Sequence, residues 1–435
     1  MALHFVLTRR EFMRLFQAGA LAAPLAWIPT CSRRKNSHAG TTAQTDDELL
    51  DEIQRASFEF FWNEADPATG QVRDRALANG HDTRKVASIA ATGFALAALC
   101  IADSRGYRRQ SDIKERVRTT LKFLLGRMPH EHGFFYHFVD MSTGGRLWNC
   151  ELSSIDTAIL LCGVLTARQH FADAEIQDLA TSIYNRVDWP WMMDGGTTLS
   201  MGWKPESGFL AGRWNHYCEL MMMYLLAIGS PTHPIPAAAW EAWSRPITHY
   251  QGIEYISGND PLFTHQYSHA WFDFRKQRDA HADYFENSIK ATKAHKLFCQ
   301  SLGERFSDYR DELWGISASD FSGGYTAWGG PPEMGPIDGS IVPCAAGGSL
   351  PFLFEDCVRV LRTIRTRFGN RAWTRYSFLD AFNPLTGWYD PDVIGIDLGI
   401  TMLMAENQRS GFVWQTFMKN PEAQAAMKSV GFHSY

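Results

Sequence analysis

The segment Val86-Ala-Ser-Ile-Ala-Ala-Thr-Gly-Phe-Ala-Leu-Ala-Ala-Leu-Cys-Ile101 decides the fold class. Its side chains are apolar nearly all round a helix, and a helix of this kind is buried in a protein core. No apolar run after residue 40 reaches the ~20 residues that a membrane-spanning helix needs. We therefore predict that residues 86–101 form a core helix surrounded by other helices of the chain.

Helical periodicity continues on both sides of this segment. The capping box Thr45-Asp46-Asp47-Glu48 predicts that a helix begins there, with Leu49 and Ile53 on its apolar side. Further helices are predicted at residues 112–125, 152–171, 174–187, 214–228, 237–243, 278–302, 354–368, 371–379 and 397–418. Strand signals are few, and the best are residues 133–138 and 252–256.

About a dozen helices over some 390 residues, joined by long loops, indicate an all-α fold in which inner and outer helices form an α/α toroid around one pocket. An α-solenoid is the alternative, but solenoids show a sequence period of 34 to 47 residues and none is present. Residues 315–351 contain nine Gly and five Pro. Loops of this length inside a compact domain are usually functional, so we expect long Gly/Pro/aromatic loops over the pocket.

The composition excludes several classes of protein. The 435 residues are 45% hydrophobic with a formal charge of −5, so disorder is excluded and a nucleic-acid partner is not expected. With eight Cys and no Cys-x-x-Cys pair, neither a disulfide framework nor a zinc motif is expected. The 15 Trp and 28 Phe suit carbohydrate binding, although core packing accounts for most of them. We expect a monomer without an integral membrane segment in the mature chain.

The N-terminus resembles a twin-arginine export signal. Thr8-Arg9-Arg10-Glu11-Phe12 precedes the weakly apolar residues 15–28; a cytoplasmic amphipathic helix is the alternative. We assign residues 1–31 to the signal, 32–45 to a polar linker and 46–435 to a single domain, and expect a periplasmic or secreted protein. Lipid attachment at Cys31 is not expected, because Ile28-Pro29-Thr30 is a poor lipobox.

Three carboxyl groups are candidates for acid–base chemistry. Glu151 and Asp156 flank the start of the predicted helix at 152–171, where Ser153 and Asp156 also read as a capping box that stabilises the helix. Glu219 precedes the apolar run Leu220–Met223. An apolar environment raises the pKa of a carboxyl group, as a general acid requires. A surface glutamate paired with a neighbour is the alternative for Glu219.

His265, His269 and Asp273 have metal-ligand spacing if the segment is helical, but Pro261 and the aromatic residues between them make a regular helix doubtful. Sugar binding and structural roles are the alternatives, and we predict no metal and no cofactor. Asp390, Asp392, Asp397 and Glu406 cluster before and within the last long helix. Asp397 also suits a purely structural role as a charge at the helix N-terminus.

The Gly-rich loop at residues 322–332 carries Tyr325 and Trp328, and Asp338 follows it. Glycine lets a backbone approach a ligand closely, and the two aromatic rings offer flat faces on which sugar rings could stack. Phosphate binding is disfavoured, because the chain has no G-x-x-x-x-G-K motif. No G-x-S-x-G motif of a serine hydrolase is present either.

Several stretches resemble the glycoamylase-like domain of bacterial glycoside hydrolase family 144, which is associated with β-1,2-glucan degradation. They lie at residues 74–76, 87–94, 133–140, 151–161, 214–219, 265–274, 338–350 and 380–384. The resemblance implies an (α/α)6 toroid and hydrolysis of β-1,2-linked glucose chains without a cofactor. It also implies an acidic pocket around Asp156 and Glu219. The expected substrate-binding residues are Asp74, His137, Trp214, His216, His269, Asp273, Tyr325, Trp328, Asp338, Asp397 and Glu406.

The predicted function is therefore cleavage of β-1,2-glucan, either internally or by release of sophorose, with an inverting mechanism implied by the resemblance. Glu219 is the predicted proton donor, with Asp156 or Asp397 as the base and Glu151 helping to shape the pocket. A glucan-binding protein without activity and a β-1,2-glucosyl transferase are the alternatives. Three departures affect the prediction: Leu398 stands where we expect Gln, Ile400 where we expect Pro, and Ser377 where we expect Gly.

Overall fold

The computed structural model describes residues 44–259 and 261–435. The predicted export signal and residues 32–43 of the predicted linker lie outside the described residues. The predicted capping box is present at the first described helix. The hydroxyl oxygen of Thr45 accepts the backbone N–H of Glu48, and the Glu48 carboxylate accepts the backbone N–H of Thr45.

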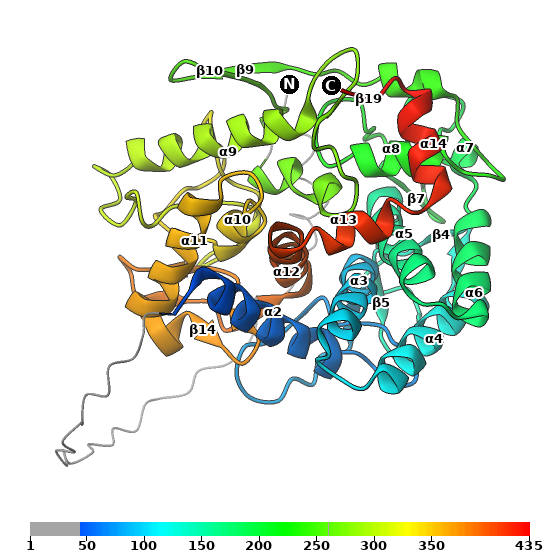
Figure 1. The fold of residues 1–435 in the computed structure, drawn as a ribbon, viewed down its shortest axis with the longest axis horizontal. Helices are drawn as coiled ribbons and strands as arrows, with labels where there is room; N and C mark the ends of the chain where they lie inside the picture. The colour runs from blue at the N-terminus through cyan, green and yellow to red at the C-terminus, as the bar shows by residue number, and fades with distance from the viewer. Residues whose placement is uncertain (1–43, 260) are drawn as a thin grey trace.

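Two layers of helices form the (α/α)6 toroid that the sequence predicts (Figure 1). The inner helices are buried on almost every side: α3 (Ile89–Arg105), α5 (Ser154–His170), α8 (Met221–Ile228), α10 (Pro343–Gly347) and α12 (Gly395–Arg409). The outer helices bury only part of their surface: α2 (Asp46–Asn63), α4 (Gln110–Gly126), α6 (Ala174–Asn185), α9 (Tyr284–Ser301) and α11 (Phe354–Thr363). The apolar segment at 86–101 thus forms strand β2 and most of the buried helix α3.

Shorter helical segments complete the rings. They are α7 (Trp189–Met192), α13 (Phe412–Phe417), α14 (Pro421–Ser429), the 3₁₀ turns η1 (Ala237–Glu241), η2 (Leu262–His265), η3 (Tyr267–Ala270) and η5 (Gly369–Arg371), and the π-helical turn η4 (Ile364–Phe368).

Short antiparallel strands lie in the connections and form small sheets of two or three strands. They are β1 (Arg75–Leu77), β2 (Val86–Ser88), β3 (His130–Glu131), β4 (Phe134–Phe135), β5 (Phe138–Asp140), β6 (Leu152–Ser153), β7 (Gly202–Lys204), β8 (Gly208–Phe209), β9 (Ile247–Tyr250), β10 (Ile253–Ile256), β11 (Gln277–Arg278), β12 (Ser319–Phe321), β13 (Gly324–Thr326), β14 (Trp373–Thr374), β15 (Ser377–Phe378), β16 (Phe382–Asn383), β17 (Trp388–Tyr389), β18 (Asp392–Ile394) and β19 (His433–Ser434).

Three of these strands run directly into inner helices and fix where those helices begin. Strand β2 leads into α3, β6 into α5 and β18 into α12 without an intervening residue. Strand β2 pairs with β5, β6 pairs with β7, and β18 pairs with β1. Paired strands restrict the backbone more than a free loop does, so the first turns of α5 and α12 are held in place together with the residues that they carry.

Glycine permits the inner helices to approach one another closely. A methyl group on Gly163 of α5 would overlap the backbone carbonyl of Gly93 in α3, and one on Gly399 of α12 would overlap the ring of Phe94 in α3. In each case the glycine leaves room for the neighbouring helix. Helices α5 and α12 therefore both pack closely against the same short stretch of α3, residues 93–94.

Five predicted elements differ from the structure. The helix predicted at 278–302 begins only at Tyr284, after β11. The helix predicted at 214–228 begins only at Met221, because the preceding backbone makes hydrogen bonds elsewhere, for instance Tyr217 N–H to Ser244 O. Residues 371–379 form the β14–β15 hairpin rather than a helix. The last predicted helix is broken between α12 and α13 at Gly411, whose φ is +69°. Residues 237–243 form the 3₁₀ turn η1.

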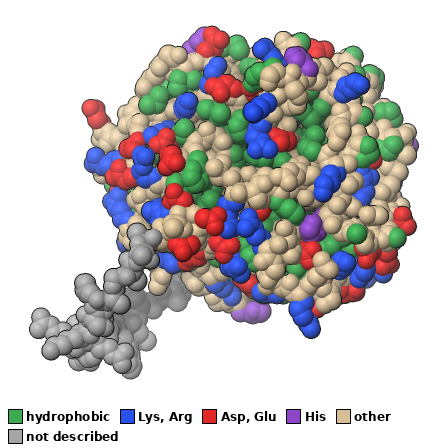
Figure 2. All heavy atoms as spheres, in the orientation of Figure 1, with side chains coloured by type: hydrophobic (Ala, Val, Ile, Leu, Met, Phe, Trp, Pro, Cys, Tyr) green, Lys and Arg blue, Asp and Glu red, His purple; other side chains and the backbone are tan. Residues whose placement is uncertain are grey.

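The surface in view carries positive and negative side chains interspersed, without a field of one sign (Figure 2). Within the described part of the chain, no helix combines the length and apolarity that crossing a membrane requires. The seven described cysteines are buried free thiols.

The contact between α3 and α5 predicts a difference between two glycine substitutions. Gly163→Ala should lower the free energy of unfolding by roughly 1–3 kcal/mol, because the methyl group forces two packed backbones apart. Gly126→Ala is the matched control, since nothing lies within 4 Å of the added methyl at the end of α4. It should raise stability by roughly 0.4–1 kcal/mol. Urea denaturation of both variants measures the difference, and an unchanged midpoint for Gly163→Ala would contradict this packing.

Candidate active site

A narrow cavity lies where inner elements of the toroid begin. Asp156 enters it from the first turn of α5, Asp397 from the first turn of α12 and Glu219 from the turn before α8. Tyr325 of β13 also lines this cavity, and the rest of the lining is mostly apolar. The structure thus brings together four residues that the sequence singles out.

Asp156 is part of a buried network of three ionisable groups. Its Oδ2 accepts the hydroxyl of Ser153 at 2.5 Å and lies 3.5 Å from Nε2 of His137. The other imidazole nitrogen of His137 lies 3.1 Å from Oε1 of Glu151. His137 therefore links the two carboxyl groups, and the predicted capping interaction of Ser153 with Asp156 is present as well.

Glu151 is held in its ionised form. Burial by itself would raise its pKa, but the hydrogen bond and the charge of His137 outweigh burial and, with Lys204, lower the pKa to about 2. A carboxyl group with this pKa carries no proton at neutral pH. Glu151 is thus suited to holding His137 in place and unsuited to donating a proton.

Glu219 is fixed through its own backbone. The hydroxyl of Ser268 donates to the carbonyl oxygen of Glu219 at 2.8 Å and accepts the N–H of Met222 at 3.1 Å. The side chain is half-buried, while Met221 to Met223 behind it are fully buried. The carboxyl group therefore lies at the boundary between an apolar wall and the cavity.

Asp397 lies in the first turn of α12 and is 7% exposed. The thiol of Cys344, at the start of α10, donates to its Oδ1 at 3.3 Å. The helix N-terminus favours a negative charge at this position. Behind Asp397, away from the cavity, lies Asp380, which shares a small internal space with it and with Cys344.

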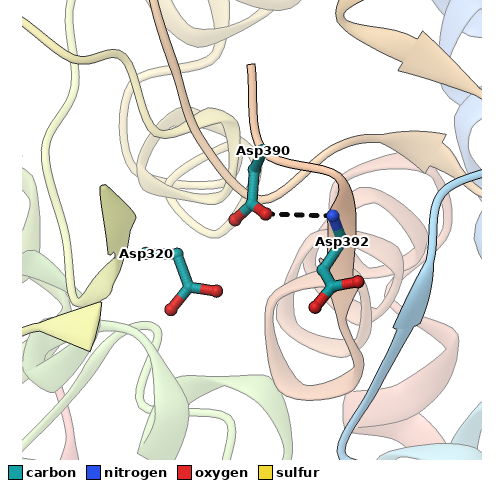
Figure 3. A group of neighbouring side chains, drawn as sticks. All are labelled: Asp320, Asp390 and Asp392. Carbon is teal, nitrogen blue, oxygen red and sulfur yellow. Dashed lines mark hydrogen bonds between the residues drawn. The ribbon is translucent and has the colours of Figure 1, made fainter. Parts of the chain in front are cut away.

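A second acidic group is formed by three aspartates (Figure 3). One carboxylate oxygen each of Asp320, Asp390 and Asp392 lies within 4.8 Å of the others, and Asp390 accepts the backbone N–H of Asp392 at 2.9 Å. Arg84 binds both oxygens of Asp392 at 2.7 Å, and Arg75 binds Asp320 at 2.6 Å. Burial, and then repulsion by Asp320, raises the pKa of Asp390 to about 8. The two arginines and the raised pKa of Asp390 thus reduce the negative charge of this group, although Arg84 is shared with Asp82 and Arg75 with Asp74.

The metal-ligand spacing in the sequence does not form a cluster. His265 lies 3.2 Å from the hydroxyl of Tyr217, and His269 lies 3.0 Å from the hydroxyl of Ser288. Asp273 instead pairs with Arg275. Burial lowers the pKa of both histidines to about 3. Over residues 44–259 and 261–435, Asp320, Asp390 and Asp392 are the one group of three such ligands within reach of a common ion.

The structure places two predicted substrate contacts, Trp328 and Glu406, in the protein interior. Trp328 is fully buried, donates its Nε1–H to the hydroxyl of Ser319 at 3.0 Å and packs against Phe321, so it has no face for a sugar. Glu406 lies at the other end of α12, is 1% exposed and binds Arg105 at 2.9 Å. Both side chains stabilise the fold, because tertiary packing places them in the interior.

Apart from Tyr325 and Asp397, the other predicted contacts do not line the cavity. Trp214 is buried and donates to the hydroxyl of Ser154 at 2.9 Å, which supports the start of α5. His216 is half-buried beside Asn215, and Asp338 caps a turn through the N–H of Ser340. Asp74 binds Arg75 at 3.0 Å, and its carbonyl accepts the first N–H of α12. None of these side chains, nor His269 or Asp273, is among the residues that line the cavity.

The sequence pattern did not mark Phe263 and Tyr267 as site residues, although both aromatic side chains line the cavity. Both lie in the segment that forms the 3₁₀ turns η2 and η3. In the sequence, the histidine spacing there suggested metal ligands rather than an aromatic cavity wall. The sequence pattern also did not mark Asp320 and Asp380. Each stands alone among apolar or small residues, and only the fold brings them next to Asp390 and Asp397.

Comparison with known proteins gives consistent matches. The Glycoamylase family model matches residues 212–421. An exo β-1,2-glucooligosaccharide sophorohydrolase (non-reducing end) of Parabacteroides distasonis is 27% identical, and the match covers 90% of this chain and 59% of that protein. The structure of an endo-β-1,2-glucanase from Chitinophaga pinensis, in complex with sophorotriose and glucose, has a TM-score of 0.85 at 27% identity and covers 90% of this chain and 99% of its own.

The resemblance predicted from the sequence is confirmed. A β-1,2-glucanase structure from Parabacteroides distasonis also superposes, with a TM-score of 0.82 at 25% identity, over 90% of this chain and 61% of its own. The chain spans 59% of the length of the curated relative that it matches. These homologues share the toroid, and their names place β-1,2-glucan enzymes on the same scaffold.

Proposed function

We propose that the chain is a glycoside hydrolase that cleaves β-1,2-linked glucan. The observation that carries the proposal is the meeting of Glu219, Asp156 and Asp397, from three separate elements, in one cavity. Glycoside hydrolysis needs a pair of carboxyl groups, one protonated and one ionised. The homologues that act on β-1,2-glucan supply the substrate class.

In the proposed mechanism Glu219 donates the proton to the leaving oxygen, since its apolar side favours the neutral carboxyl. Asp397 acts as the base that activates water, as expected of an inverting enzyme, where the two carboxyl groups lie roughly 6.5–9.5 Å apart. Asp156 is the weaker candidate for the base, because Ser153 and His137 already hold its Oδ2. Tyr325, half-exposed on the cavity wall, is the aromatic surface offered to a sugar ring.

The products formed from linear and cyclic β-1,2-glucans test this function. We expect purified protein to depolymerise one or both, with the products read by chromatography. A ladder of oligosaccharides indicates internal cleavage, and sophorose alone indicates release from a chain end. Binding without any product would favour a glucan-binding protein, and longer products would favour a glucosyl transferase; either outcome would refute hydrolysis.

Glu219→Gln tests the proton donor. The amide keeps the size of the side chain but cannot donate a catalytic proton, so turnover should fall by about 10²–10⁴-fold while glucan binding is retained. The alkaline limb of the pH profile should flatten in the variant. Glu254→Gln is the matched control, because the Glu254 side chain is 67% exposed on β10, and it should leave turnover unchanged. Near-wild-type turnover in Glu219→Gln would show that another group donates.

We also propose export through residues 1–31 and a monomeric enzyme in the periplasm or outside the cell. Changing Arg9 and Arg10 to Lys should leave precursor in the cytoplasm, because the paired arginines are the feature that twin-arginine export reads. Changing Arg33 and Arg34 to Lys is the control, since that pair follows the predicted signal. Fractionation of expressing cells measures both variants, and normal export of the first pair would refute the assignment.

A further inference from the structure

Asp380 is a buried carboxyl group that the proposed mechanism does not use. It follows β15, is 3% exposed and is held by the backbone on two sides. Its Oδ2 accepts the N–H of Asp320 at 2.7 Å, and its own N–H donates to the carbonyl of Asp392 at 3.2 Å. This side chain is therefore fixed in position before any substrate arrives.

Asp380 and Asp397 both line one small space, and after burial the neighbouring Asp397 carboxyl is the largest cause that raises the pKa of Asp380. Two neighbouring buried carboxyl groups repel each other when both are ionised, which favours one proton held between them. The carboxyl that holds the proton acts as donor, and the other stays ionised as acceptor. The surroundings decide which is which.

The surroundings favour the proton on Asp380. Asp397 lies at the N-terminus of α12 and receives the thiol of Cys344, and both features stabilise a negative charge. Asp380 is the more deeply buried of the two, and no N–H or O–H donor among the described residues reaches its Oδ1. Burial, together with repulsion by Asp397 and Asp320, raises the pKa of Asp380 well above its usual range.

We propose that Asp380 is a positioning residue that remains protonated at neutral pH and donates a hydrogen bond to Asp397, so that Asp397 stays ionised and correctly oriented as the base. This inference rests on the proposed function only in the role given to Asp397. The protonation of Asp380 itself is a property of the folded protein.

Other ionisable groups face the pair from the elements packed around it. They stay unchanged in every variant at position 380. They are Asp320 from β12, Asp390 from the segment before β18, Arg75 from β1 and Cys344 from α10. Because these groups are the same in each variant, a change in the pH profile reports on position 380.

Two substitutions separate a protonated donor from an ionised group. Asp380→Asn keeps both hydrogen bonds, because the amide oxygen accepts from Asp320 and the amide N–H donates to Asp397. Asp380→Leu has a similar volume and removes both. We expect Asp380→Asn to keep most of the turnover, and Asp380→Leu to lose roughly 10- to 100-fold in kcat with little change in KM, as expected for a lost hydrogen bond to a charged group.

The direction in which the acidic limb of the pH profile shifts distinguishes a protonated Asp380 from an ionised one. Loss of the donor destabilises ionised Asp397, so the acidic limb should move to higher pH in Asp380→Leu and stay in place in Asp380→Asn. If Asp380 were ionised in the native protein, Asp380→Asn would remove a negative charge beside Asp397 and move the acidic limb to lower pH. That shift, or equal loss of turnover in the two variants, would overturn the proposal.

Infrared difference spectra of the folded proteins test the proton without activity. The carbonyl band of a protonated carboxylic acid should be present at neutral pH in the wild type and reduced in Asp380→Asn, with unchanged thermal unfolding as evidence of folding. An identical band in both proteins would overturn the proposal. If the wild type does not cleave glucan, the proposed function fails, and the infrared comparison still decides the state of Asp380.

Discussion

The close packing of α5 and α12 against α3 is the constraint on which the cavity depends. Gly163 allows α5 to touch the backbone of α3 at Gly93, and Gly399 allows α12 to lie on Phe94. Helices held this closely have little freedom to slide or rotate, since interiors are packed at crystal density. The first turns of α5 and α12 therefore have a fixed separation, and with them Asp156 and Asp397.

The second requirement is to bury many carboxyl groups together. Isolated buried charges are costly, so each must be paired, hydrogen-bonded or neutralised. The structure uses all three means: Arg84 pairs with Asp392, His137 bridges Glu151 and Asp156, and a raised pKa neutralises Asp390. These buried carboxyl groups thus differ in protonation state, which is the condition that acid–base chemistry needs.

The sequence was informative where function depends on local pattern. Asp156 could be placed because it opens an apolar helix, and Glu219 because an apolar run follows it directly. The sequence was misleading at Trp328, since a Gly-rich loop reads as exposed although its tryptophan folds inward. It was silent at Asp320 and Asp380, because their partners lie far along the chain and neither spacing nor periodicity marks a contact of that kind.

Two of the three departures from the family pattern, Ser377 and Leu398, have different physical meanings. Ser377 adopts φ +81°, a region that costs an L-residue roughly 1–2 kcal/mol more than glycine, so the hairpin keeps a conformation that suits the expected glycine better. Leu398 is 4% exposed and borders the space shared by Asp380 and Asp397. A glutamine there would bring an amide donor next to the carboxyl pair, whereas leucine brings none. With leucine at this position, the proton on Asp380 becomes the natural donor to Asp397.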